Sequence, residues 1–301
     1  MGKEHALFEP GARGIRFNVR VCLVVGAGLS LLCALYAKIL ALLAVEWYTD
    51  GDATHGFFVP IVSGYVMWEQ RTRLAGLPVR PSVWGAVLLG FGLMMLLIGS
   101  AGSERYLQQA SFIVVLAGLI LLLLGSGFLR VLAFPIGFLF FMVPLPSMVM
   151  DAFAFPLQLL ATKTAAVCLF HLGIPVLREG NLIVLADTTL EVAEACSGLR
   201  SLQALLGLGT VYAYFFERVM WKRWLLVLLS IPIAISANAF RVSGTGVVAH
   251  YWGVEAAEGF YHMFSGWLIF VVAFLLLIGC GSLLSKLAQG TPHAVKGKGL
   301  A

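Results

Sequence analysis

The chain has 301 residues, of which 60% are hydrophobic and 12% are charged, and its mean hydropathy is +0.94. A soluble domain usually carries about 25% charged residues, so this composition excludes an ordinary soluble protein and indicates one that lies in a lipid bilayer. The net charge of +5 does not indicate nucleic-acid binding. The basic residues lie between apolar runs rather than in one patch, a pattern typical of the charges that orient membrane helices.

Apolar runs recur along the whole chain and predict an all-α, polytopic membrane helix bundle, because a spanning helix needs about 20 apolar residues. Its first run is too long for the apolar core of a signal peptide, so we interpret it as a retained helix. We expect residues 1–301 to form a single membrane domain with polar cytoplasmic tails at 1–18 and 286–301. The eight predicted spans lie near 19–45, 57–69, 83–100, 107–125, 128–147, 197–216, 224–248 and 262–284.

One further apolar segment, 151–171, is interrupted by polar residues and proline. We predict that it lies in the membrane interface as an amphipathic helix rather than crossing the bilayer. With this segment excluded, the basic clusters all fall on the cytoplasmic side, as the positive-inside rule requires. The interrupting residues are Asp151, Pro156, Gln158, Lys163 and His171.

This topology leaves four stretches on the outer side of the cytoplasmic membrane: 46–56, 101–106, 148–196 and 249–261. Within the longest, Gly180-Asn181 separates two arms rich in β-forming residues. The portion 173–195 is therefore predicted to form a small β-hairpin over the outer mouth of the bundle.

The cysteines show neither a CxxC pair nor the spacing of metal ligands, so we expect no disulfide framework and no metal site. Four of the five, Cys22, Cys33, Cys168 and Cys280, lie in apolar stretches, where a cysteine is most often a small buried hydrophobe. Cys196 differs because it lies in the polar sequence Glu194-Ala195-Cys196-Ser197-Gly198.

Three candidate catalytic residues meet on the outer side in this topology. Cys196 begins the sixth span, Arg241 lies in the outward half of the seventh, and His262 begins the eighth. A thiol becomes a good nucleophile when a nearby cation or a helix N-terminus lowers its pKa. A histidine can transfer protons, and an arginine stays charged and can stabilise an oxyanion or bind a substrate carboxylate.

Each of these residues also has a structural interpretation when it is taken alone. Cys196 alone would be a core cysteine, Arg241 could extend to the outer headgroups, and His262 could be an interfacial histidine with one hydrogen bond. Ionisable groups inside a membrane are costly, however, so three at one depth favour a functional site.

Around these residues the sequence resembles the exosortase/archaeosortase family of membrane cysteine transpeptidases. The resemblance covers most of the chain, and its specificity lies in the order and spacing of short motifs. These are His55-Gly56-Phe57-Phe58-Val59-Pro60 leading to Trp68, Ala195-Cys196-Ser197-Gly198-Leu199-Arg200-Ser201, Asn238-Ala239-Phe240-Arg241-Val242, and His262 followed by Gly266.

The resemblance implies an activity and a substrate class. Family members recognise C-terminal sorting tails, in bacteria those of PEP-CTERM proteins, cleave near a short motif and pass the acyl group to another acceptor. The family's cysteine, arginine and histidine fall on Cys196 (nucleophile), Arg241 (transition-state stabiliser) and His262 (general acid/base). No metal or organic cofactor is implied, and the acceptor is unknown. Some members carry an extra C-terminal domain linked to exopolysaccharide export, which this sequence lacks.

Four further residues are expected to support the site or bind substrate. His55 precedes the glycine of its motif and either lines the pocket or has a structural role. Asn238 lies one turn before Arg241 and either orients it or makes an ordinary contact between helices. Arg200 lies in the sixth span, and Glu194 is a carboxylate with which it could pair.

The sequence therefore predicts a cysteine-dependent membrane peptidase or transpeptidase that acts on exported precursors anchored in the bilayer. Two alternatives are a secondary transporter and a non-catalytic factor for exopolysaccharide assembly or export. A transporter usually has repeated halves, which the sequence does not show. Both alternatives should work without the Cys196 thiol.

Overall fold

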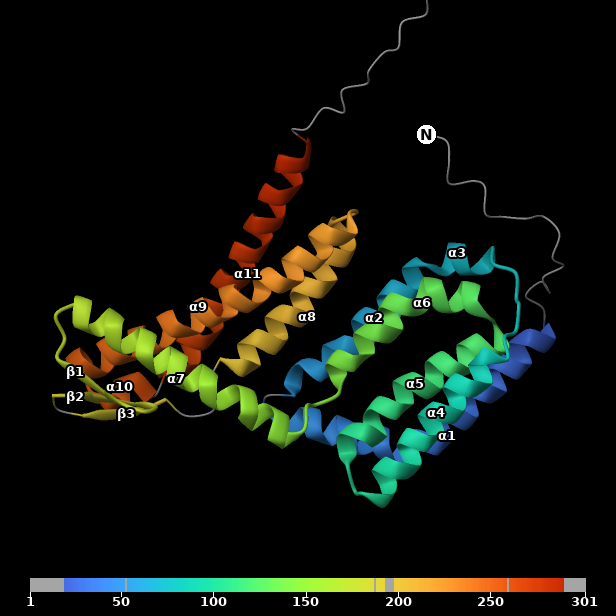
Figure 1. The fold of residues 1–301 in the computed structure, drawn as a ribbon, viewed down its shortest axis with the longest axis horizontal. Coiled ribbons are helices and arrows are strands. Elements are labelled where there is room, and N and C mark those ends of the chain that lie inside the picture. The colour runs from blue at the N-terminus through green and yellow to red at the C-terminus, as the bar shows by residue number, and fades with distance from the viewer. Residues whose placement is uncertain (1–18, 52, 187, 193–197, 259, 290–301) are drawn as a thin grey trace, which may run out of the picture. The chain divides into compact units, whose positions relative to one another are not determined.

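The computed structural model describes residues 19–51, 53–186, 188–192, 198–258 and 260–289. Internal contacts divide the chain into two compact units, Met1–Pro146 and Ser147–Ala301, here called the N-terminal and C-terminal units. Each unit is built mainly of helices (Figure 1). The prediction of a single membrane domain stays a prediction, and of its two tails only residues 286–289 fall within the described chain.

The N-terminal unit contains helices of very different length, joined by short turns. Its elements are α1 (Val19–Thr49), η1 (Thr54–Phe57), α2 (Phe58–Glu69), α3 (Arg71–Ala75), α4 (Trp84–Ala101), α5 (Arg105–Leu123), α6 (Ser126–Phe138) and η2 (Leu139–Met142). The helices α4 and α5 form an antiparallel hairpin with α1 alongside α5, and α2 packs against α6.

Glycines bring the backbones of α4 and α5 close together. Gly85, Gly92 and Gly99 recur every seven residues on α4 and are buried. A methyl group on Gly92 would lie 2.6 Å from Val115 Cγ2, and one on Gly118 of α5 would lie 2.6 Å from the Leu89 backbone nitrogen. Lipid tails are as apolar as leucine, so the hydrophobic effect does not drive helices together inside a bilayer. Close van der Waals contact of this kind is therefore a main source of helix association there.

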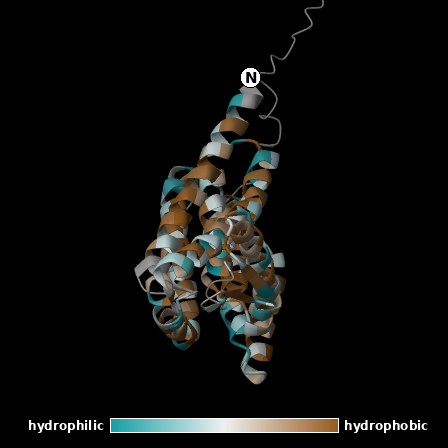
Figure 2. Cartoon of the chain, turned by 90° about the vertical axis from the view of Figure 1, so that its left-hand side faces the viewer, coloured by the Kyte–Doolittle hydropathy of each residue, from teal (hydrophilic) through white to brown (hydrophobic). Residues whose placement is uncertain are grey.

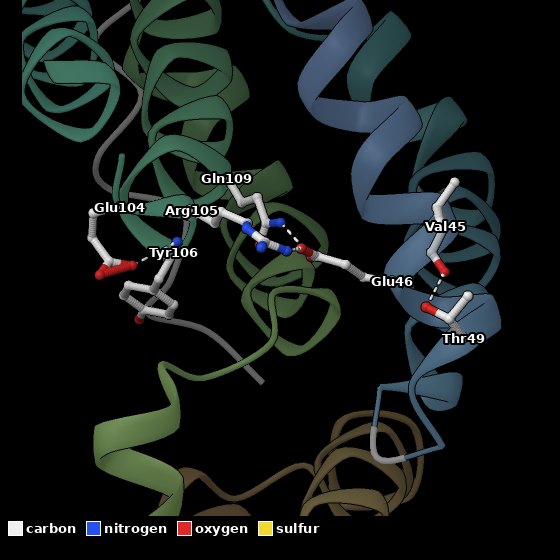
Figure 3. Close-up of polar contacts among 7 residues, drawn as sticks. All are labelled: Val45, Glu46, Thr49, Glu104, Arg105, Tyr106 and Gln109. Atoms are coloured by element: carbon white, nitrogen blue, oxygen red, sulfur yellow. Dashed lines mark hydrogen bonds and ion pairs between the residues drawn. The ribbon is translucent and has the colours of Figure 1, made fainter. Parts of the chain in front are cut away.

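Polar side chains tie together one end of the N-terminal unit (Figure 3). Arg105 Nη1 lies 2.8 Å from Glu46 Oε1, and the Gln109 side chain donates to the other carboxylate oxygen of Glu46 at 2.6 Å. The ion pair is half open to its surroundings, since the side chain of Arg105 is 75% exposed and that of Glu46 is 21% exposed. It joins the last turns of α1 to the first turn of α5.

The C-terminal unit is arranged around one long helix, α9, which contacts all four of the other helices in this unit. Its elements are α7 (Ser147–His171), β1 (Val176–Glu179), β2 (Leu182–Leu185), β3 (Thr189–Glu191), α8 (Leu199–Phe216), α9 (Met220–Trp252), α10 (Val254–Glu258) and α11 (Phe260–Gln289). The core between α7, α9, α10 and the strands is aliphatic, with Leu169 and Ile183 almost fully buried.

The predicted hairpin is confirmed and gains a third strand. The strands form an antiparallel sheet in the order β1-β2-β3. Glu179 pairs with Leu182, so the turn consists of Gly180 and Asn181, and Gly180 adopts a φ of +62°. Glycine favours this left-handed conformation, which suits the tight turn.

Basic side chains satisfy backbone carbonyls at the ends of α8 and α11. Arg223 donates to the carbonyl oxygens of Glu217 (2.7 Å) and Tyr214 (3.2 Å) at the end of α8. Lys222, which is 5% exposed, donates to the Leu284 carbonyl of α11 at 3.1 Å. The contacts of Arg223 satisfy carbonyls that lack helical partners, and both basic side chains place positive charge near the negative ends of helix dipoles.

Among the described residues, six helices are long and apolar enough to cross a membrane: α1, α4, α5, α7, α9 and the Phe264–Lys286 part of α11. Hydrophobic ribbon runs along the helices in Figure 2. The chain is thus a polytopic, all-α membrane protein, but this set of spans differs from the eight expected. The helices α2 and α6 have 12 and 13 residues, about 18 to 20 Å, which is shorter than the roughly 30 Å hydrocarbon core.

The difference is largest at α7, which includes the segment expected to lie in the interface. This helix runs unbroken for 25 residues, about 37 Å, with Pro156 inside it. Gln158 and Thr162 are buried against neighbouring helices, and the Thr162 hydroxyl donates to the Gln158 carbonyl at 2.7 Å. Burial therefore accommodates Gln158, whereas Asp151, Lys163 and His171, which the sequence pattern also treats as interruptions, are exposed on the helix surface.

The glycine contacts of the N-terminal unit generate a first prediction. Gly118→Ala forces a methyl group against the α4 backbone, and such overpacking usually costs about 1 to 3 kcal/mol. Gly90→Ala is the matched control, because nothing lies within 4 Å of a methyl group there. Thermal unfolding of the protein in detergent should show a lower midpoint for Gly118→Ala and an unchanged or higher one for Gly90→Ala. Equal midpoints would contradict this packing.

Candidate functional site

The site is built on α9, which carries two polar residues on one face. Asn238 is 4% exposed and Arg241 is half-buried. Residues three apart in a helix point to the same side, so both side chains face the neighbouring helices α8 and α11. A buried amide and a half-buried guanidinium are costly in a membrane protein, and such positions are usually functional.

Asn238 packs against the start of α8. The N-cap of α8 is Gly198, whose φ of +84° is left-handed. A methyl group on Gly198 would lie only 2.6 Å from Asn238 Cγ. Both the conformation and the close approach require glycine, and together they place the first turn of α8 directly on the Asn238 side chain.

The first turn of α8 is closed by its own hydrogen bonds. The Ser201 hydroxyl donates to the Gly198 carbonyl at 2.8 Å, and the Leu202 amide donates to the same oxygen at 2.9 Å. Ser201 ends the motif that begins at Ala195, but it is not among the predicted site residues. Its position three residues after a helix-starting glycine was the available signal, because a hydroxyl there can reach back to the cap.

Arg241 lies against α11 at another glycine. A methyl group on Gly266 would be 3.6 Å from Arg241 Cζ and 3.7 Å from Nε, which is ordinary van der Waals distance, so the guanidinium lies beside this glycine with room for a methyl group between them. Gly266 was part of the motif in the sequence, but its place beside Arg241 follows only from the structure.

Two small cavities flank Asn238. One lies between α8, α9 and α11 and is lined by Ser201, Asn238, Arg241 and Gly266 together with apolar residues. The other faces α7 and is lined by Gly198, Asn238 and aliphatic side chains that include Ala161. The same amide therefore borders the guanidinium on one side and the start of α8 on the other.

The predicted nucleophile and general acid/base adjoin these contacts in the chain. Cys196 and Glu194 lie outside the described residues; Cys196 is two residues before Gly198 in the sequence. His262 lies in the first turn of α11, four residues or about one turn before Gly266, and its side chain is outside the described part.

The remaining two predicted residues are placed differently. Arg200 is the second residue of α8, and its side chain is exposed. His55 lies in η1 of the N-terminal unit, where its Nε2 is 3.0 Å from the Phe141 carbonyl oxygen. The neighbouring Trp47 donates to the Met142 carbonyl at 2.8 Å and packs on Gly56. In this unit the His-Gly motif thus joins α1 to η2.

The arrangement is suited to stabilising negative charge. A helix N-terminus carries partial positive charge from its unpaired amides, and α8 begins at Gly198. One helical turn from Asn238, the Arg241 guanidinium adds a full positive charge beside a small, mostly apolar cavity. In such surroundings an oxyanion or thiolate is stabilised more strongly than in water.

A protein-family model described as transmembrane exosortase matches residues 47–279. The match includes α8, α9, the start of α11 and the His-Gly motif of the N-terminal unit. No curated protein and no solved structure matches the chain.

The contact between Gly198 and Asn238 generates a second prediction. Gly198→Ala adds both left-handed strain, about 1 to 2 kcal/mol, and a clash with Asn238. Gly253→Ala is the matched control, because Gly253 has the same φ of +84° but open space around it. Thermal unfolding should show a clearly larger loss of stability for Gly198→Ala. The packing described here is wrong if the two variants lose equal stability.

Proposed function

Because the chain belongs to the transmembrane exosortase family, we propose that it is a cysteine-dependent membrane peptidase or transpeptidase. Its substrates are precursors anchored in the bilayer by C-terminal sorting tails of the PEP-CTERM type. The proposed reaction takes place at the outer face of the cytoplasmic membrane, the side on which the topology predicted from the sequence places Cys196, Arg241 and His262.

The proposed reaction has two acyl-transfer steps. The Cys196 thiolate attacks the scissile carbonyl carbon, forming a C–S bond, and the C–N bond then breaks. His262 gives its proton to the leaving amine of the tail, which departs from the thioester. An acceptor nucleophile or water next attacks the thioester, His262 takes its proton, and the Cys196 thiolate is regenerated.

Arg241 is proposed to stabilise the oxyanion in both steps. A guanidinium keeps its charge in a dry environment and offers several donors in a fixed plane. Asn238 is proposed as a positioning residue that holds the start of α8 next to Arg241. Arg200, exposed at the start of α8, and Glu194 are proposed to contact the substrate. The hydrogen bond of His55 to the Phe141 carbonyl favours a structural role for that residue.

One observation carries the proposal. Arg241 packs on Gly266, one turn after His262, while Asn238 on the same face of α9 packs on Gly198, two residues after Cys196. These contacts bring the three motifs, which are more than 60 residues apart from first to last, to one face of a single helix. This arrangement supports a shared site for the three residues.

The third prediction concerns the nucleophile. Cys196→Ala should reduce removal of the tail from a tagged PEP-CTERM-type precursor by more than about 1,000-fold, because loss of a covalent nucleophile usually has at least this effect. Processing is measured as a gel shift after co-expression. Cys168→Ala and Cys280→Ala serve as controls, because both thiols lie in apolar helices outside the site, and processing should be normal. Normal processing by Cys196→Ala would favour a transporter or a non-catalytic export factor.

The fourth prediction concerns the guanidinium. Arg241→Lys keeps the charge but loses the planar set of donors, so processing should fall by at least about 100-fold, the usual cost of removing one oxyanion donor. The protein should still reach the membrane at a normal level, as measured by quantitative immunoblotting. Full activity of the lysine variant would show that a positive charge alone is sufficient at this position.

A further inference from the structure

The N-terminal unit contains a large groove that the proposed reaction does not use. Its volume is about 790 Å³, and it is lined by residues of α1, α2, α3, α5, α6 and η2. Most of its lining side chains are apolar, and the polar ones are those of Trp47, Ser63 and Arg71. The indole N–H of Trp47 already donates to the Met142 carbonyl. The helix α2 contributes a stripe at helical spacing: Pro60, Ser63, Gly64 and Met67.

The dimensions of the groove fit one hydrocarbon chain. Its lining extends along α1 from Val25 to Trp47, about 33 Å, which is close to the thickness of the bilayer's hydrocarbon core. The 790 Å³ is the volume open to the centres of water-sized molecules; over that length, with the roughly 1.4 Å radius of water added on each side, it gives a mean width of about 8 Å. A hydrocarbon chain, roughly 4 Å across, fits this width, whereas an α-helix of about 10 to 12 Å does not.

Ser63 provides a hydrogen-bonding group without a protein partner. The residue is 4% exposed, and within the described chain its Oγ has no hydrogen-bond partner. Other helical hydroxyls in this protein, such as those of Thr162, Ser230 and Ser243, donate to the carbonyl four residues earlier. A buried hydroxyl left without a partner is costly, so Ser63 indicates an acceptor that a bound molecule supplies.

Arg71 provides positive charge at one mouth of the groove. Its guanidinium lies 4.0 Å from the centre of the Trp68 ring and donates to the Trp68 carbonyl at 3.0 Å. Across the described residues, no carboxylate oxygen lies within 4.0 Å of it. Arg71 comes eight residues after Ser63 in the sequence, and both residues line the same groove, so a single extended molecule could lie against both.

We propose that this groove is a binding site for one anionic phospholipid. The phosphate binds Arg71, an ester carbonyl accepts a hydrogen bond from Ser63, and one acyl chain lies along the apolar wall beside Gly64. No atom lies within 4 Å of the position that a methyl group on Gly64 would occupy, so there is room for the acyl chain. The site lies wholly within the N-terminal unit and is independent of the proposed catalytic residues.

Native mass spectrometry of the full-length protein in detergent tests the proposal, with phosphatidylglycerol and phosphatidylcholine of identical acyl chains as probes. One phosphatidylglycerol should bind per protein, and more tightly than phosphatidylcholine. Arg71→Gln should weaken phosphatidylglycerol binding about fivefold, the usual contribution of one basic residue to an anionic lipid. Gly64→Leu should weaken it at least about tenfold, because the added side chain fills the groove.

Two matched controls separate groove effects from general ones. Gly90→Leu makes the same change on α4, where open space also surrounds the glycine, and Arg73→Gln removes an exposed neighbouring charge. Both should bind phosphatidylglycerol as the unmodified protein does, and so should Cys196→Ala. Should Gly64→Leu fail to fold, Met67→Trp fills the same groove.

Three outcomes would overturn the proposal. The first is unchanged binding by the groove-filling variants, and the second is equal affinity for the two lipids. The third is displacement of the lipid by a spanning poly-leucine helix, which would identify the groove as a helix-binding site. Each readout measures lipid binding alone, so failure here is distinguishable from failure of the proposed peptidase activity.

Discussion

The close approach of α9 to its neighbours is the constraint on which the site depends. In a bilayer, lipid tails are as apolar as leucine, so helices associate through direct packing and hydrogen bonds. Gly198 removes the side chain that would separate α8 from Asn238, and Gly266 of α11 lies beside Arg241. A buried amide and a half-buried guanidinium on one helix therefore face both partner helices.

The two units use glycine to opposite effect. In the α4–α5 hairpin, Gly92 and Gly118 are covered by the partner helix, and the backbones meet. On α2, Gly64 faces open space and lines a groove of about 790 Å³. The first arrangement is complete within the protein, whereas the second leaves apolar surface and the Ser63 hydroxyl for a molecule from the bilayer.

The sequence predicted the all-α membrane class, the hairpin at Gly180-Asn181 and the three motifs that suggest catalysis. It did not predict that α7 is a continuous helix of spanning length. Gln158 lowers the apparent hydrophobicity of that segment, but its burial is a property of the packed unit. Other differences from the eight expected spans arise because helices such as α2 and α6 are shorter than the hydrocarbon core.

The sequence by itself determined that this chain belongs in a membrane and contains the motifs of its family, because composition and short motifs are local properties. Only the tertiary structure decided that Asn238 and Arg241 lie between two glycines, that His55 bonds to η2, and that Ser63 faces a groove. Those facts depend on contacts between segments far apart in the chain. Such contacts depend on how the side chains of several segments pack together, and no single stretch of sequence specifies that packing.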